Sequence, residues 1–144
     1  MEVNGTVFSY GRYNGSYSPS SGRFGPIGEG VLYKKTGADA TKFIKERTGK
    51  YPTNVYTVGV NTDAAYNYLN DIYNAGEYNT VDSRVINTYV IGGSNCTTTV
   101  IDALQAGGSG IPMIQTPAGV VNYMNDLNNG QLPWFKGTVI TPFF

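Results

Sequence analysis

A strand-to-helix junction at residues 85–106 is the feature that most constrains the fold of this chain. Residues 85–91 form an apolar run rich in β-branched and aromatic side chains, which predicts a strand. Gly92 and Gly93 end that run, and Ser94 or Asn95 can cap a helix that begins at Cys96. The sequence therefore predicts a helix over about residues 96–106 whose first turn carries the only cysteine of the chain.

The position of Cys96 at a helix N-terminus makes it a candidate nucleophile. The unpaired backbone N–H groups and the dipole of a helix N-terminus favour negative charge, and the thiolate is the nucleophilic form of cysteine. Two interpretations stay open, because a lone cysteine in a small domain is more often a buried apolar residue than a nucleophile. The chain contains no histidine, although a cysteine nucleophile usually needs a base within hydrogen-bonding reach.

The segments around the junction predict a single α+β domain over residues 1–144. The Asn4-Gly5 pair favours a type I′ turn in a hairpin over residues 1–10. Alternating and helical periodicities predict the remaining elements: strands at 30–35 and 54–60, and helices at 40–48, 62–75 and 117–127. We expect a small, mainly antiparallel sheet packed against three to four helices. Residues 11–29 predict a long loop that contacts substrate or is disordered, and residues 132–140 an apolar tail that packs on the core.

Composition limits the partners of such a domain. The net charge is zero and 14% of residues are charged, which argues against a nucleic-acid-binding protein. Eight of the ten basic residues and four of the ten acidic ones lie in residues 1–50, so that part carries +4 and residues 51–144 carry −4. This asymmetry can orient a partner, but a solvated basic helix face explains it as well. The chain has no apolar run of membrane-spanning length and no signal-peptide pattern, and we expect no cofactor and no metal site.

The block at residues 89–104, from Tyr89 through Cys96 to Leu104, resembles a signature of a known family. It is similar to the Asn-Cys-Thr-Thr-x-hydrophobic-x-Asp-(Ala/Val)-Leu block of circularly permuted papain-like thiol hydrolases. These are relatives of the NlpC and lecithin-retinol acyltransferase groups, including domains at the C-termini of RHS-repeat polymorphic toxins. Residues 7–13 also resemble the strand-and-glycine segment that follows the catalytic histidine in such domains.

The resemblance implies a permuted papain-like fold and a bacterial effector domain that is secreted or delivered into a target cell. It maps Cys96 to the nucleophile of an amide or ester hydrolase, and it assigns Asn95, Thr97 and Tyr10 to substrate or oxyanion contacts. Peptide, peptidoglycan and lipid-ester substrates all fit, and an immunity protein is an expected partner. In this family the histidine precedes the cysteine, so it would lie shortly before Met1, on a strand of which this chain holds only the end. The isolated chain is then expected to be nearly inactive.

Two other interpretations remain. The chain can be a non-catalytic binding or structural module that keeps the fold and buries Cys96. Its nineteen glycines and twelve tyrosines also fit an extracellular adhesin fragment without enzymatic ancestry.

Overall fold

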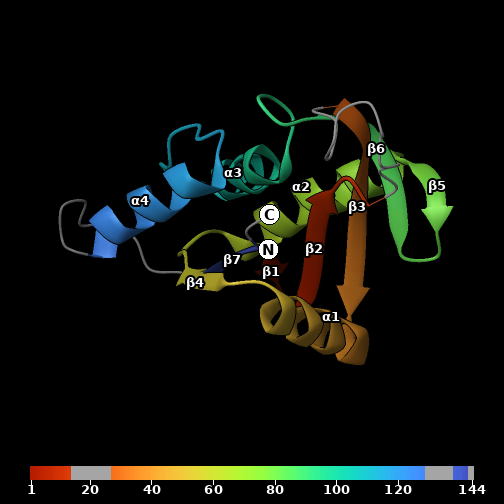
Figure 1. Ribbon diagram of the computed structural model, residues 1–144, viewed down its shortest axis with the longest axis horizontal. Coiled ribbons are helices and arrows are strands. Elements are labelled where there is room, and N and C mark those ends of the chain that lie inside the picture. The colour runs from red at the N-terminus through yellow and green to blue at the C-terminus, as the bar shows by residue number, and fades with distance from the viewer. Residues whose placement is uncertain (14–26, 129–137, 143–144) are drawn as a thin grey trace.

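The computed structural model describes residues 1–13, 27–128 and 138–142, and these form an α+β fold. Its main sheet has five strands in the order β1-β2-β3-β6-β5, with every neighbouring pair antiparallel. The strands of this sheet are β1 (Glu2–Val3), β2 (Thr6–Gly11), β3 (Ile27–Thr36), β5 (Glu77–Thr80) and β6 (Ser83–Val90). The predicted fold class, an antiparallel sheet with helices packed on it, is confirmed (Figure 1).

The predicted N-terminal hairpin is confirmed and uses the expected turn. Asn4 and Gly5 both have positive φ, at 50° and 72°, as a type I′ turn requires. The turn joins β1 to β2 with Val3 opposite Thr6, and the pairing continues to Met1, which exchanges two backbone hydrogen bonds with Phe8. Because β1 is so short, β2 is paired along its whole length only with β3.

Helices cover both faces of the sheet. α1 (Gly37–Lys50) lies against the face that carries Ser9 and Tyr33, and Phe43 of α1 has its ring 6.3 Å from that of Tyr33. α2 (Thr62–Ala75) and α3 (Cys96–Ala106) cover the opposite face. There the core is built from buried side chains of both layers, among them Phe8, Leu32, Leu69, Ile101 and Leu104. The predicted α2 and α3 are confirmed, whereas α1 extends beyond the predicted 40–48 at both ends.

A further helix and a two-stranded sheet lie beside the main sheet and share its core through Tyr56, Val120 and Met124. α4 (Pro117–Asn128) begins at the predicted proline, and β4 (Thr53–Thr57) pairs with β7 (Thr138–Pro142) in a separate two-stranded sheet. The strand expected at 54–60 therefore ends earlier, and the tail expected to pack on the core contributes β7. Residues 132–137 of that tail and 14–26 of the predicted loop lie outside the described residues, while the two ends of that loop belong to β2 and β3.

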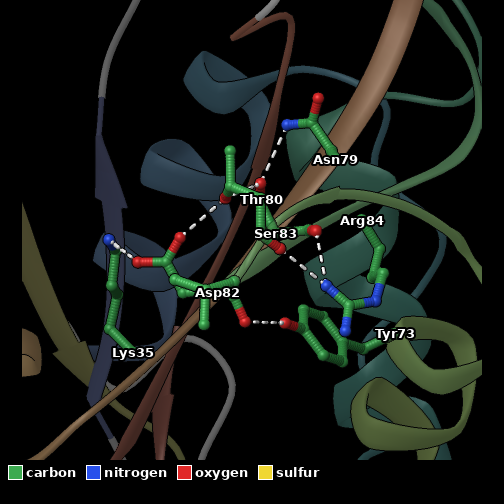
Figure 2. Close-up of polar contacts among 8 residues, drawn as sticks. Lys35, Tyr73, Asn79, Thr80, Asp82, Ser83 and Arg84 are labelled. Carbon is green, nitrogen blue, oxygen red and sulfur yellow. Dashed lines mark hydrogen bonds and ion pairs between the residues drawn. The ribbon is translucent and has the colours of Figure 1, made fainter.

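One strand, β5, is absent from the prediction. Its residues are mostly polar and exposed, so they carry no hydrophobic alternation. The strand forms because β6 offers backbone partners to it, and because side chains of the turn lock the hairpin. Figure 2 shows this turn, where Asp82 accepts from Lys35 and from Thr80, and Arg84 Nη1 donates to the carbonyls of Thr80 and Ser83. The Arg84 guanidinium also lies 4.7 Å from the ring centroid of Tyr73 on α2.

Candidate functional site

Cys96 is the first residue of α3, where the chain leaves the end of β6. Its side chain is partly buried and its thiol is free. The preceding residue, Asn95, is the N-cap, and Thr98 completes a capping box by accepting from the Asn95 backbone N–H. The sequence prediction that the cysteine stands in the first turn of a capped helix is confirmed.

Asn95 holds this helix start in place through every polar atom of its side chain. Its Oδ1 accepts from the backbone N–H groups of Thr97 and Thr98 at 2.9 and 3.1 Å. Its Nδ2 donates to the carbonyls of Ile91 and Gln115 at 2.7 and 2.9 Å. The side chain is only 3% exposed, so these bonds are made away from water, where an unmade one is costly. The orientation of the thiol therefore depends on one buried amide.

Two tyrosines lie beside the thiol. The hydroxyl of Tyr89, near the end of β6, donates to Cys96 Sγ across 3.9 Å. The ring of Tyr10, on β2, lies 5.5 Å from the ring of Tyr89, and its hydroxyl donates to Asn87 Oδ1. Asn87 Nδ2 in turn donates to Ser94 Oγ at 2.8 Å. A hydrogen-bonded chain thus runs from β2 across the sheet to the residues that precede Cys96.

This chain crosses the sheet because β3 has a glycine at the crossing point. Gly30 lies between β2 and β6 and pairs with Asn87. A Cβ atom at position 30 would come within 2.0 Å of the Tyr10 hydroxyl and 2.6 Å of its ring. The Tyr10 side chain therefore occupies the space that any other residue at position 30 would fill. Only glycine allows a side chain of β2 to reach one of β6 over the intervening strand.

Burial sets the electrostatics of these tyrosines. Burial raises the pKa of Tyr89 far above its ordinary value, and the negative charge of a nearby Cys96 thiolate raises it further. Burial also raises the pKa of Tyr10, with the same contribution from Cys96. Both phenols therefore stay protonated at neutral pH, and Tyr89 remains a hydrogen-bond donor to the sulfur. The α-amino group of Met1 is buried as well, and desolvation lowers its pKa to about 6 against the attraction of Cys96.

The structure places all four predicted site residues close together, with Asn95, Cys96 and Thr97 at the start of α3 and Tyr10 next to Tyr89. Cys96 and Tyr10 lie on either side of Tyr89. Asn95 and Thr97 are buried, and their described contacts are within α3 and its flanking segments, so a role in binding substrate stays a prediction. Sequence reasoning missed Tyr89, Asn87 and Ser94. The period-2 alternation of β6, which places Asn87 and Tyr89 on one face, is the signal that could have found two of them.

Two cavities lined by described residues do not have Cys96 in their walls. One of about 480 Å³ borders the outer edge of β6 beyond β5, next to Gly76 and Asn87. Another, of about 270 Å³, lies between β1 and the start of α2. Among the described residues, no group of three or more His, Cys, Asp or Glu side chains could hold a metal ion. Within the same ranges, no helix has the length and apolarity needed to cross a membrane.

Comparison with known proteins gives this chain no relative. No protein-family model matches it, and no curated protein or solved structure is significantly similar to it. The function therefore has to be argued from the site itself.

Proposed function

We propose that the chain is a thiol hydrolase domain in which Cys96 attacks an amide or ester carbonyl. The observation that carries the proposal is the environment of its sulfur: the first turn of a rigidly capped helix, with a phenol donor 3.9 Å away. The thiolate is the reactive form of a cysteine, and a helix N-terminus and a phenol hydroxyl are both groups that can offer hydrogen bonds to the reacting centre. The resemblance of residues 89–104 to permuted papain-like hydrolases supports the same role, and with it an effector domain delivered to a target cell.

The proposed reaction is acyl transfer through a thioester. The Cys96 sulfur forms a bond to the carbonyl carbon, and the carbonyl electron pair moves onto oxygen. When that oxyanion collapses, the C–N or C–O bond breaks and the leaving group departs with a proton. Water then attacks the thioester, which releases the carboxylic acid and restores the thiol.

The contacts around Cys96 limit which hydrogen-bond donors are available to stabilise the oxyanion. The N–H groups of Thr97 and Thr98 are already bonded to Asn95 Oδ1. The backbone N–H of Cys96 itself and the Tyr89 hydroxyl are therefore the donors that we assign to the oxyanion. This assignment replaces the Thr97 N–H, which a general helix N-terminus argument would have included.

The 144 residues contain no histidine to take the thiol proton. In the proposed reaction that proton therefore passes to solvent water, and solvent returns a proton to the leaving group.

A second candidate function is a non-catalytic binding module, because the 144 residues contain no histidine. An acylation experiment separates the two. The folded chain is incubated with p-nitrophenyl acetate, and the acetyl group is located by peptide mass mapping. A hydrolase site acquires the acetyl group on Cys96, faster than glutathione does at the same pH, and Cys96→Ala acquires none. A Cys96 that stays unmodified until the chain is unfolded would favour the binding module.

The Tyr89 hydroxyl offers a finer test of the same site. In Tyr89→Phe the sulfur loses a donor, so alkylation of Cys96 by iodoacetamide should slow by about three- to tenfold, as expected for one hydrogen bond. Tyr78→Phe is the matched control, because Tyr78 is 73% exposed on β5. An unchanged rate in Tyr89→Phe would remove the phenol from the proposed mechanism.

A further inference from the structure

Arg12 lies on the same face of the sheet as the thiol site, just beyond the end of β2. Its guanidinium crosses β3 directly over Gly28: a Cβ atom at position 28 would lie 2.6 Å from Arg12 Nε and 3.4 Å from Nη2. Gly28 and Gly30 alternate along β3, so Arg12 and Tyr10 cross the strand in parallel, two residues apart. The absence of a side chain at position 28 therefore makes room for a guanidinium.

Two nitrogens of this guanidinium have no partner. Nε and Nη1 are both inaccessible to solvent and make no hydrogen bond. The ion pairs among the described residues are Lys35–Asp82 and Lys42–Glu46, and neither involves Arg12. A buried, charged donor without an acceptor costs free energy that a bound anion can recover. The guanidinium thus carries hydrogen-bonding capacity that the folded chain leaves unused, and an anion would have to displace the atoms that cover these two nitrogens in order to use it.

The register of the sheet places this unsatisfied charge next to the thiol site. Gly28 is the cross-strand partner of Tyr89, and directly opposed residues of antiparallel strands point to the same face. The guanidinium over Gly28 therefore neighbours the Tyr89 side chain, whose hydroxyl contacts Cys96 Sγ. An anion bound by Arg12 and a carbonyl presented to Cys96 would lie on either side of one tyrosine.

We infer that Arg12 forms a carboxylate-binding subsite, and that the substrate of Cys96 carries a free carboxylate close to the carbonyl that is attacked. A single guanidinium fits a singly charged, planar carboxylate, which binds through two parallel hydrogen bonds along one edge of the group. A carboxylate would therefore pair with Nη2 and with one of the two unpartnered nitrogens, Nε or Nη1. The lysines of β3, Lys34 and Lys35, lie six and seven residues from Gly28 along the strand and are engaged with Asn70 and Asp82. This inference rests on the proposed function for the identity of the attacking group, but not for the anion site.

Alkylation of Cys96 tests the subsite without requiring catalysis. Iodoacetate and iodoacetamide differ only in a carboxylate against an amide. The second pair, 3-maleimidopropionate and N-ethylmaleimide, has a longer reach and differs in a carboxylate against a hydrogen. For each pair, the ratio of the charged to the neutral rate is measured on the folded chain. In Arg12→Gln that ratio should fall about tenfold, the effect of losing a charged hydrogen bond, while the neutral rate stays the same. Arg12→Lys should restore the ratio in part.

Controls separate the local site from overall charge and from misfolding. Lys45→Gln removes one positive charge from the exposed surface of α1 and should leave both ratios unchanged. Glutarate should protect Cys96 from iodoacetamide in the parent chain but not in Arg12→Gln, and inorganic phosphate at equal ionic strength should protect less. A thermal melt of each variant confirms folding.

Each outcome has a consequence. Charge-selective labelling that depends on Arg12, but without acyl transfer by Cys96, would keep the subsite and reject the proposed hydrolase. If the neutral reagents label Cys96 rapidly but Arg12→Gln does not change the ratio of the charged to the neutral rate, the carboxylate subsite would be rejected. The proposal that Cys96 is a nucleophile would stand. Stronger protection by phosphate than by glutarate would overturn the assignment to carboxylate, and a Cys96 inert to all four reagents would overturn both proposals.

Discussion

At the scale of single residues, the position of the Cys96 thiol is fixed by hydrogen bonds that the neighbouring Asn95 side chain makes. Four hydrogen bonds from one buried side chain connect the first turn of α3 to the end of β6 and to Gln115. The sequence predicted the cap, because Asn before a helix is a strong local signal. It could not predict the two donations from Nδ2, because their acceptors come from turns that only the folded chain brings together.

Removal of this side chain should be costly. Asn95→Ala loses the cap and the two donations from Nδ2 to the carbonyls of Ile91 and Gln115, so the free energy of unfolding should fall by about 1–3 kcal/mol. Asn95→Asp keeps the cap and loses only the Nδ2 donations, and should cost less. Urea unfolding measures both. Equal losses in the two variants would show that the cap contributes little.

At the scale of elements, the glycines of β3 decide what can cross the sheet. The sequence identified a strand at 30–35 but placed Gly28 and Glu29 in a loop, because glycines usually interrupt strands. In the structure β3 begins at Ile27 and the glycines lie within it. Gly30 leaves space for Tyr10 of β2 and Gly28 for Arg12 just beyond that strand, an arrangement that periodicity along one strand does not reveal.

A pair of glycine substitutions tests this role. Gly30→Ala places a methyl group within 2.0 Å of the Tyr10 hydroxyl, so the unfolding free energy should fall by about 1–3 kcal/mol and the Tyr10–Asn87 bond should break. Gly49→Ala is the matched control: it lies in α1 with no atom within 4 Å of its added Cβ, and should stabilise the chain by about 0.5–1 kcal/mol. Denaturant titration measures the change in unfolding free energy of each variant. If Gly30→Ala left the unfolding free energy unchanged, the result would contradict the passage of the Tyr10 side chain over position 30.

The β5–β6 turn has a pH dependence that can be predicted from Asp82. The hydrogen bond from Lys35 is the largest cause that lowers the pKa of Asp82 below its ordinary value of 3.8. A carboxyl with a lowered folded-state pKa stabilises the fold at neutral pH and loses that contribution as the pH falls through the folded value. Asp82→Asn should therefore cost about 0.5–1 kcal/mol at pH 7, since the pair is partly exposed.

The measurement compares the unfolding free energies of the parent chain and Asp82→Asn from pH 7 to pH 2. Their difference should be constant above about pH 5 and shrink below the ordinary carboxyl value of 3.8. A difference that persists unchanged at pH 2 would mean that the carboxylate charge is not what stabilises this turn.

At the scale of the whole molecule, the five-stranded sheet and the β4–β7 pair are expected to differ in stability. β2 and β3 lie between other strands and beneath helices, whereas β4 belongs to a two-stranded sheet and has Val55 57% exposed. Isolated two-stranded sheets are marginally stable in water. Amide hydrogen exchange, followed by mass spectrometry, should therefore be slowest in β2, β3 and β6 and clearly faster in β4. Equal protection would show that the two sheets unfold as one unit.

Much of this architecture could be predicted from the sequence, and the parts that could not share one cause. Elements with strong local signals, such as the Asn4-Gly5 turn, the Asn61 cap and the helix from Pro117, are confirmed. The polar β5, the early end of β4 and its pairing with β7 depend on partners distant in the chain. The same holds at the thiol, where Cys96 was identified from its neighbours but Tyr89 and Asn87 only from the sheet.

The bond from Asn95 to Gln115 has a consequence for motion. Gln115 lies two residues before α4, twenty positions downstream of the amide that it holds. A displacement of α4 away from α3 would withdraw an acceptor from the side chain that orders the first turn of α3. The position of the Cys96 sulfur then depends on the connection that leads into the last helix, and a partner that displaced that helix would also move the sulfur.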